Sequence, residues 1–430
     1  MSPLPHQWKF ARLNQLGRWI GGGTPSKANP GFWVVKGIPW VSPKDMKKLY
    51  LDDAEDHITE TAVEQSSTNV VAEGSVLVVT RSGILSRTLP VAKALRPLAI
   101  NQDMKALIPH KGVSSDYVLH ALRAMEPRIL QECSKSGTTV ANLDTDRFLN
   151  FQIPLPPLQV QRCVVAKLEN LFGRSKSAHE ELTRIPCLVR RYKQAILAAA
   201  FRGDLTANWR IVNDISLDHD WSSTTLGDLC KDVRYGTAEK CFYQPKDTPV
   251  LRIPNVVKGR IDTNDLKYGR FNKKEIENLA LRSGDLLVIR SNGSLDLVGR
   301  TALATDEVVG YLYAGYLIRL RLDSDRISPA FAQLAFEEPE IRQRIENFAK
   351  STSGVNNING QQLKALKLPI PPLQEQREII RRVESAFTHV DHTSAKAERA
   401  TRLLDRLDQA TLAKAFRGGP KALFGECLSP

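Results

Sequence analysis

The chain of 430 residues is 42% hydrophobic and 25% charged, a composition that fits about two to four folded domains. The 60 Lys and Arg residues outnumber the 47 Asp and Glu residues, and the net charge of +13 favours a polyanionic partner over a merely soluble basic protein, because basic side chains displace counterions condensed on phosphate. No run of about 18 apolar residues is present to span a membrane, and six scattered cysteines without CxxC spacing argue against a zinc ribbon or redox dithiol and indicate a reducing, cytoplasmic location.

Residues 1–153 predict one globular α/β domain. VLVVT (76–80) is a short β-rich run bounded by glycine and polar residues, and DYVLHALRAMEPRIL (116–130) follows as a helix. A loop of Ser, Thr, Gly and Asn residues then leads into a short amphipathic segment at 142–153.

Residues 154–204 predict a long helical spacer. The PLPP segment (154–157) ends the preceding domain, since proline removes a ladder donor and is accepted at the start of a helix. Apolar or small residues then recur at alternating spacings of four and three from Val164 to Ile196, which is a heptad seam. Gly203 stands where a helix-ending glycine belongs, and Pro186 predicts a kink or a short break.

The remainder of the chain follows the same plan. Residues 205–368 predict a second α/β domain, residues 369–419 a second helical spacer and residues 420–430 a C-terminal tail. Within the second domain, β-rich runs, a helical stretch and an amphipathic segment are expected at 285–290, 316–322, 329–348 and 357–368.

The two spacers are copies of one another. IPLPPLQVQR (153–162) recurs as LPIPPLQEQR (368–377), 215 positions later, and 20 of 50 aligned pairs are identical between 154–203 and 369–418. The domains share only a skeleton, in which Trp8, Leu13 and Leu16 recur as Trp221, Leu226 and Leu229. A variable–constant–variable–constant order suggests one framework that presents two different surfaces.

The repeat predicts that the two helices pair with each other. Each seam needs a partner, and copies related by a pseudo-two-fold axis run antiparallel, as an intramolecular coiled coil. We therefore expect an α/β (α+β) fold with two domains joined by two long antiparallel helices; the alternative is that each helix packs on its own domain. The residues expected to pair the helices or dock other subunits are Leu168, Leu182, Val189, Phe201, Val383, Leu404, Leu407 and Phe416.

Catalytic motifs are missing from the sequence. It contains no GxxxxGK[ST] loop, no NPPY-type tetrapeptide of amino-methyltransferases and no HExxH. The glycines at 21–23 lead into Pro25 rather than a helix, which is a weak nucleotide-binding signal. His389 and His392 share a helix face without further ligands, so a solvated or packing role is expected and no metal site is predicted.

Polar and basic clusters in the predicted loops are the candidate binding residues. Arg, Lys, Asn, Ser and Thr supply phosphate contacts and base-edge readout, although the same residue types also serve turns and helix caps. In the first domain the candidates are Thr24, Ser26, Lys27, Arg81, Ser82, Lys135, Ser136, Thr138 and Asn142. In the second domain they are Thr237, Lys240, Arg290, Ser291, Asn292, Lys350, Ser351, Ser353, Asn356 and Asn357.

The sequence resembles the specificity subunit of type I restriction–modification systems. The resemblance rests on the PLPPLQ–QR and PIPPLQEQR starts, the two AFRG exits, and GTPSK (23–27) and VLRIPN (250–255). It implies two target-recognition domains that each read half of a bipartite, asymmetric site in double-stranded DNA. It also implies docking of two modification subunits and of restriction subunits, while S-adenosylmethionine, ATP and Mg belong to those partners and this chain carries no cofactor and no catalysis.

Two rival functions remain open at this point. The recognition part of a single-chain restriction–methylation enzyme would need catalytic motifs that this chain lacks. A coiled-coil scaffold that never touches DNA would explain the heptads but not two divergent basic domains of about 150 residues on a repeated frame.

Overall fold

The computed structural model describes residues 8–135, 140–215, 221–245, 247–350 and 354–416. The chain forms two compact units, which are residues 1–183 with 398–430 (unit 1) and residues 184–397 (unit 2). Each unit therefore combines one variable domain with parts of both long helices. The boundaries of the compact units thus differ from the boundaries between domains and spacers in the sequence.

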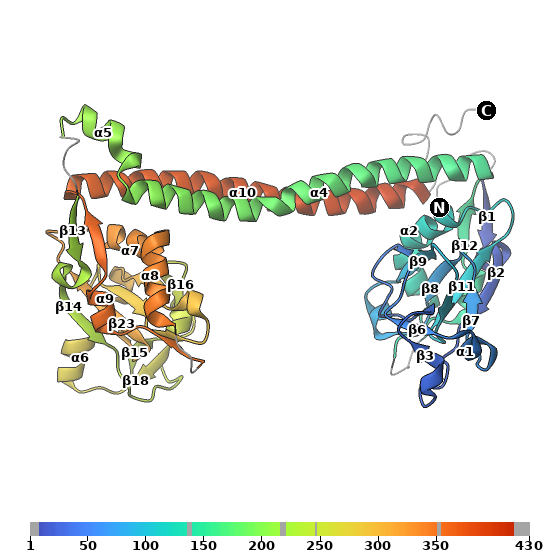
Figure 1. Cartoon of the computed structure of the whole chain (residues 1–430), viewed down its shortest axis with the longest axis horizontal. Helices are drawn as coiled ribbons and strands as arrows, with labels where there is room; N and C mark the ends of the chain where they lie inside the picture. The colour runs from blue at the N-terminus through green and yellow to red at the C-terminus, as the bar shows by residue number, and fades with distance from the viewer. Residues whose placement is uncertain (1–7, 136–139, 216–220, 246, 351–353, 417–430) are drawn as a thin grey trace. The chain divides into compact units, whose positions relative to one another are not determined.

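Unit 1 contains two five-stranded sheets, ordered β2-β11-β8-β9-β5 and β3-β6-β4-β10-β7, and the antiparallel pair β1-β12 (Figure 1). Its strands are β1 (Lys9–Arg12), β2 (Gly17–Gly21), β3 (Trp33–Val34), β4 (Ile38–Val41), β5 (Tyr50–Leu51), β6 (Asp56–Ile58), β7 (Asn69–Val71), β8 (Val76–Val79), β9 (Val91–Ala94), β10 (Leu98–Ile100), β11 (Met104–Pro109) and β12 (Gln152–Leu155). Its shorter helices are α1 (Glu60–Glu64), α2 (Ser115–Cys133) and α3 (Thr145–Asn150).

Strand β8 lies at the centre of the unit 1 core, which explains its unbroken apolar run. All four of its residues are fully buried, because neighbouring strands and helix α2 leave neither face of the strand to solvent. Helix α2 contains the helix predicted at 116–130, and it packs on β8 and β9.

Unit 2 is built on sheets ordered β14-β23-β19-β21 and β18-β15-β22, with the small pairs β13-β25, β16-β17 and β20-β24. Its strands are β13 (Ser222–Thr225), β14 (Cys230–Tyr235), β15 (Thr248–Leu251), β16 (Val256–Val257), β17 (Arg260–Ile261), β18 (Lys267–Gly269), β19 (Leu286–Ile289), β20 (Ser291–Asn292), β21 (Thr301–Leu303), β22 (Leu312–Tyr313), β23 (Leu317–Leu322), β24 (Asn356–Asn357) and β25 (Lys367–Ile370). Its shorter helices are α5 (Ala207–Val212), α6 (Lys273–Leu279), α7 (Pro329–Glu337), α8 (Pro339–Ala349) and α9 (Gly360–Lys364).

The helical stretch expected at 329–348 is two helices rather than one. Helix α7 ends at Glu337, and Glu338 has an extended backbone with ψ of 134° before α8 begins. Pro339 disfavours helical backbone at the preceding residue, and the Glu338 carboxylate accepts a hydrogen bond from Ile341 N at 2.8 Å, which caps the new helix. The two halves consequently pack on each other as separate elements.

Helices α4 (Leu158–Phe201) and α10 (Leu373–Phe416) are the predicted spacers, and each is 44 residues long. In unit 1, Ser175 Oγ donates to Asp408 at 2.9 Å and His179 Nε2 lies 3.0 Å from Asp405. Partner numbers on α10 fall as residue numbers on α4 rise, so the two helices run antiparallel there, as expected.

Of the kink or short break expected at Pro186, the break does not occur. Helix α4 continues through this proline without interruption. In unit 2 the two helices stay in contact beside it, since Lys193 Nζ bonds Asp391 at 2.6 Å and lies 4.8 Å from the centre of the Phe387 ring. An interior proline costs about 3 kcal/mol, and contacts of this kind contribute part of what keeps the helix continuous.

The eight residues expected to pair the helices differ in burial. Leu182, Val189 and Leu404 are half-buried on the helix surfaces, whereas the Leu407 side chain is 57% exposed. The other four are buried in the cores of the units rather than between the helices alone: Leu168 and Phe416 in unit 1, Phe201 and Val383 in unit 2.

The repeated AFRG exits anchor the helix ends. Phe416 of α10 lies 5.1 Å from the Tyr117 ring in the unit 1 core, and Phe201 of α4 lies 5.0 Å from Phe331 in unit 2. Gly203, with φ of 83°, takes the left-handed conformation that ends α4. Gly418 lies outside the described residues.

The repeated glutamine of the PPLQ–QR motif fastens each helix start to its domain. Gln161 is buried, accepts from Ser114 N at 2.8 Å and donates to the carbonyls of Gly112 and Pro156. Gln376 is equally buried and makes the same three kinds of bond, to Ser328 N and the carbonyls of Arg326 and Pro371. A buried amide with every partner satisfied explains why the two spacer copies share this residue.

Replacing Gln376 with alanine is expected to lower the free energy of unfolding of unit 2 by about 1–3 kcal/mol, because it leaves buried backbone groups without partners. Gln161→Ala is expected to do the same to unit 1. The measurement is hydrogen exchange at β19 and β8, which report on the two units separately. Gln374→Ala is the control, since Gln374 is exposed beside Gln376; equal effects of Gln374→Ala and Gln376→Ala would contradict the role given to the buried amide.

Within the described residues, none of the helices has the length and apolarity needed to cross a membrane.

Candidate nucleic-acid interface

In unit 2, the three polar clusters found in the sequence meet at one place. Ser291 and Asn292 form strand β20 directly after the buried strand β19, and they pair with Asn357 and Asn356 of β24 in the late loop. Thr237 follows strand β14 and bridges to Ala314, which precedes strand β23. Strand ends that meet at one edge of the fold therefore collect side chains that lie up to 120 positions apart in the sequence.

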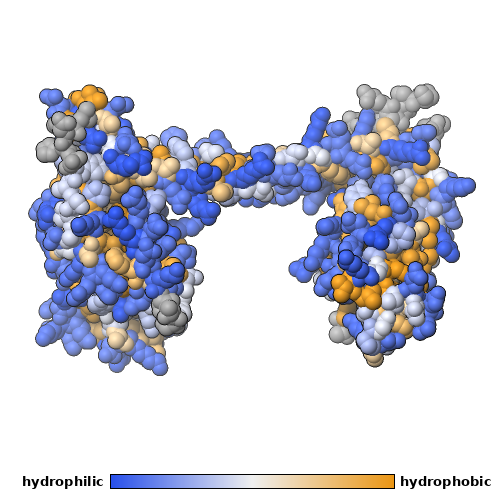
Figure 2. All heavy atoms as spheres, in the orientation of Figure 1, coloured by the Kyte–Doolittle hydropathy of each residue, from blue (hydrophilic) through white to orange (hydrophobic). Residues whose placement is uncertain are grey.

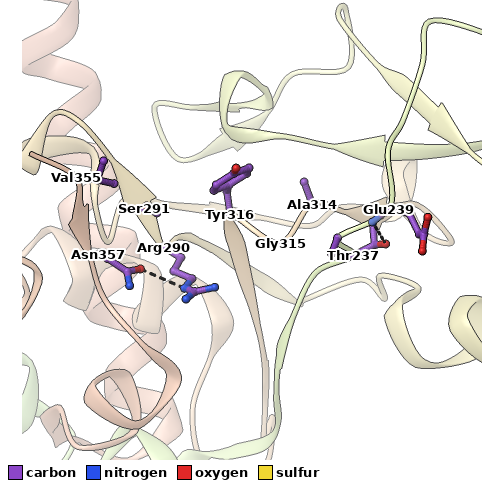
Figure 3. Close-up of a pocket in the computed structure, with 10 residues that line it drawn as sticks. Thr237, Glu239, Arg290, Ser291, Ala314, Gly315, Tyr316, Val355 and Asn357 are labelled. Carbon is purple, nitrogen blue, oxygen red and sulfur yellow. Dashed lines mark hydrogen bonds between the residues drawn. The ribbon is translucent and has the colours of Figure 1, made fainter. Parts of the chain in front are cut away.

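A cavity of about 600 Å³ lies at this edge. Figure 3 shows Arg290 and Asn357 at one end of it, Thr237 and Glu239 at the other, and Tyr316 between them. The ring of Tyr316 is 64% exposed. The lining residues are Thr237, Ala238, Glu239, Arg290, Ser291, Ala314, Gly315, Tyr316, Val355 and Asn357. We call this group the unit 2 cavity.

Arg290 is held in a defined position within the unit 2 cavity. Its Nε donates to Asn357 Oδ1 at 3.1 Å, and its guanidinium lies 4.7 Å from the centre of the Tyr235 ring. The Tyr235 hydroxyl in turn accepts a hydrogen bond from Gly360 N at 2.7 Å. A cation over an aromatic face and one side-chain hydrogen bond restrict the rotamers of a long side chain.

A buried charge network supports the strands behind the cavity. Arg319 on β23 is 1% exposed and pairs with Asp232 on β14, and Asp285 binds Arg321 through two hydrogen bonds of 2.8 and 2.7 Å. Partial burial acts to raise the pKa of Asp232, but the hydrogen bond and charge of Arg319 outweigh it and lower that pKa overall. The network thereby fixes β14, which ends at Tyr235, against β23.

Unit 1 has a counterpart of this edge. Arg81 follows strand β8 and bridges to Asn142 in the late loop, as Ser291 does to Asn357. The Thr24 hydroxyl donates to the Gln102 side chain, and Arg81 Nε lies 3.9 Å from an Asp103 carboxylate oxygen. The sequence-predicted residues Thr24, Arg81 and Asn142 thus lie near strand ends that correspond to those around the unit 2 cavity.

Backbone hydrogen bonds set the residue correspondence between the units, and it agrees with the ungapped match of GSVLVVTRSG (74–83) to GDLLVIRSNG (284–293) in the sequence. Thr80 N donates to Asp103 O in unit 1, and Arg290 N donates to Tyr316 O in unit 2, so Arg290 corresponds to Thr80 and not to Arg81. Likewise, Gly23 N binds Ile100 O as Thr237 N binds Tyr313 O. Because successive residues of extended chain point to opposite sides, Arg81 and Arg290 serve different faces.

The other predicted binding residues lie around these edges or outside the described chain. Ser82 caps a short 3-10 helix through a bond from Ile84 N, and Asn292 accepts from Ser294 N, so both serve local turns. Asn356 donates to Gly293 O at 3.0 Å. The exposed members are Ser26, Lys27, Lys135, Lys240 and Lys350, while Ser136, Thr138, Ser351 and Ser353 lie outside the described residues.

The sequence reading missed the aromatic residues of this face. Tyr235 and Tyr316 were not singled out, although each directly neighbours a turn glycine in the sequence. A second missed group surrounds Tyr243, whose ring is 65% exposed and lies beneath Lys267 and Arg252 at 5.1 and 5.7 Å. The predicted Lys240 lies 5.6 Å from the Phe242 ring in the same group. The run KCFYQPK (240–246), in which two adjacent aromatic residues lie between two lysines, carried this signal.

His389 and His392 are both exposed on α10. Among the described residues, no three His, Cys, Asp or Glu side chains are grouped so that they could hold a metal ion.

Comparisons with known proteins agree with the repeated architecture. A family model described as a type I restriction modification DNA specificity domain matches residues 5–186 and again residues 218–401. The chain is similar to the type I restriction enzyme EcoKI specificity subunit of Escherichia coli (32% identity, covering 73% of this chain and 67% of that protein). It is also similar to the StySPI specificity subunit of Salmonella potsdam (35% identity, with the same coverage of both proteins).

Solved structures share the fold. A chain from a study of complex assembly and conformational transition in the type I R-M system superposes with a TM-score of 0.71 at 20% identity, covering 97% of this chain and 100% of that one. The HsdS subunit of Thermoanaerobacter tengcongensis superposes with a TM-score of 0.62 at 19% identity, covering 97% and 98% of the two chains. The expected α/β domains and paired long helices are thereby confirmed.

Proposed function

Because this chain belongs to the type I restriction modification DNA specificity family, we propose that it directs a modification and restriction complex to a bipartite, asymmetric site in double-stranded DNA. One domain reads each half of the site. The observation that carries this proposal is the gathering of polar residues at corresponding strand ends in both units, on a frame that is otherwise repeated. The two edges carry different side chains, which is what reading two different half-sites requires.

The long helices offer a surface for two copies of one partner. Leu188 and Tyr192 of α4 are 57% and 51% exposed, and Leu403 and Leu407 of α10, each 215 positions later, are 52% and 57% exposed. In unit 2 this stripe borders an apolar groove of about 580 Å³ between the helices. Apolar side chains (orange) are visible on the surface of the helices in Figure 2. An exposed apolar stripe repeated once per unit suits two modification subunits.

Substitutions in the exposed apolar stripe test how many modification subunits bind this chain. The double substitution Leu188→Ser with Tyr192→Ser is expected to remove one of two modification subunits from the complex, and Leu403→Ser with Leu407→Ser is expected to remove the other. Native mass spectrometry of the co-expressed complex counts the copies. Gln194→Ser, at an exposed polar position on α4, is the control and should leave two copies bound. Retention of both modification subunits by each of the two double variants would contradict this docking surface.

The chemistry of the complex resides on its partners in this proposal. The modification subunits supply S-adenosylmethionine-dependent adenine methylation, and restriction subunits supply ATP- and Mg-dependent translocation and cleavage. This chain supplies position and sequence choice only and carries no catalytic residue or cofactor of its own. Its sequence supports that division, since it contains neither a P-loop nor an amino-methyltransferase tetrapeptide. The complex works in the cytoplasm, where its DNA lies.

Co-expression with the modification subunit tests the proposal. The complex is expected to methylate adenine in one bipartite motif with a fixed unspecified gap, detected by methylome sequencing of the host. The purified chain alone is expected to bind DNA without methylating or cleaving it. Methyl transfer by the chain alone, or a complex that methylates without sequence preference, would contradict the proposal.

A further inference from the structure

We propose that Arg290 selects a guanine in the half-site that unit 2 reads, with Tyr235 and Asn357 as its positioning residues. This inference rests on the proposed function and assigns one base contact within it. It starts from the donors that Arg290 keeps. Among the described residues, the only hydrogen-bond partner of its guanidinium is Asn357, which accepts from Nε alone. Both terminal nitrogens remain for a ligand.

The remaining donors match one base edge. Two parallel N–H groups of a guanidinium fit the O6 and N7 acceptors of guanine in the major groove, and no other base presents two acceptors there. Tyr235 lies against the guanidinium at 4.7 Å, and Asn357 fixes its near side, so the fork is oriented before DNA arrives. Because the guanidinium is oriented before binding, less side-chain entropy is lost when DNA binds. This favours a specific base contact over the nonspecific contact of a mobile charged side chain.

The surroundings favour a base over a backbone phosphate. The unit 2 cavity also contains Glu239, whose carboxylate repels phosphate and can accept only from a donor such as the amino group of cytosine or adenine. The exposed ring of Tyr316 lies between Arg290 and Glu239 and offers an apolar surface to a base edge. A phosphate site would instead gather several cations and backbone N–H groups.

Unit 1 does not contain this arrangement. At the position that corresponds to Arg290 it has Thr80, which is 8% exposed and donates its hydroxyl to Asp103 O. Gly21 takes the place of Tyr235. Gly21 ends β2 and pairs with Lys105 of β11, and Tyr235 ends β14 and pairs with Ile318 of β23, which corresponds to Lys105. A side chain at Gly21 would meet open space, so the platform is missing there for reasons of sequence and not of room. The guanine contact therefore belongs to one half-site only.

The experiment measures base discrimination by the complex of the full chain with its modification subunits. Competition binding compares the duplex carrying the methylome-defined site with duplexes in which each G·C pair is replaced singly. Arg290→Ala is expected to cut the preference for one G·C pair by roughly ten- to a hundredfold and to leave every other position unchanged. Arg290→Lys should keep overall affinity but retain only part of this preference, because a lysine keeps the charge but not the planar fork.

The positioning residues give a graded result. Tyr235→Leu should weaken the preference at the same base pair, and Tyr235→Phe, which keeps the ring, should restore most of it. Arg81→Ala is the matched control in unit 1 and should leave this base pair unaffected. The inference is overturned if Arg290→Ala and Arg290→Lys both keep the wild-type preference at every G·C pair, or if affinity falls equally for all sequences. A wild-type complex without any sequence preference would instead refute the proposed function.

Discussion

Replacing Asp285 with alanine is expected to lower the free energy of unfolding of unit 2 by about 3–5 kcal/mol, the usual cost of removing one partner from a buried ion pair. The Asp285 side chain is 2% exposed and binds Arg321 through both carboxylate oxygens, while Arg319 Nε lies 4.0 Å away. Without the carboxylate, the fully buried Arg319 keeps only Asp232 as a counter-charge, and Arg282 N loses its acceptor. Two guanidiniums are then left poorly compensated in a low dielectric.

Hydrogen exchange at β19 and β23 measures the loss in unit 2, and exchange at β8 in unit 1 serves as the internal reference. Glu340→Ala is the control variant, since Glu340 is 81% exposed and its pair with Arg344 is long, at 3.9 Å. That substitution is expected to change stability by no more than about 0.5 kcal/mol. Similar protection in wild type and Asp285→Ala would show that the network does not stabilise the sheet.

Unit 1 is expected to lose stability as the pH falls from about 6.5 to 4 because of His120. This residue lies on α2, is 2% exposed, and its ring centre is 5.9 Å from that of Phe172 on α4. Burial first, and then the positive charge of Arg123, lower the pKa of His120 to about 4. The unfolded chain, with a pKa near 6.5, binds a proton in this window that the folded chain does not. The contribution is fully present above pH 6.5 and declines by roughly 3 kcal/mol by pH 4.

The comparison of wild type with His120→Leu isolates this contribution. Denaturation of both proteins across pH 4–7 should show a stability difference that changes by up to about 1.4 kcal/mol per pH unit in favour of the variant as the pH falls. Leucine fills the apolar site beside Phe172 and cannot take up a proton. Parallel pH profiles for the two proteins would show that His120 accepts a proton in the folded state without cost.

The sequence by itself determined the repeat, the two spacer helices and the main strands. Seam residues from Val164 to Ile196 and the apolar runs of β8 and β19 are local patterns, because burial on one helix stripe or on both faces of a strand selects neighbouring residue types directly. The family resemblance followed from the same repeat. Those features needed no knowledge of which distant segments touch.

Prolines show where local rules stopped being sufficient. Pro127 and Pro186 lie inside α2 and α4 without ending them, whereas Pro339 separates α7 from α8. The penalty of an interior proline is similar at each site, so the outcome depends on what surrounds it. The buried face of α2 and the partner helix of α4 keep the first two helices continuous. At Pro339, the Glu338 side chain instead stabilises the start of a new helix, α8, by capping it.

Only the tertiary structure decided which polar residues act together. The sequence indicated that Arg81 and Arg290 each follow one of two matching strands, and backbone pairing places them one residue apart and so on opposite sides of the extended chain. Tyr235, Asn357 and Glu239 join Arg290 because β14, β19 and the late loop end at one edge. Sheet register and loop closure are set by contacts between residues far apart in the chain, and a single sequence records the residues but not those pairings.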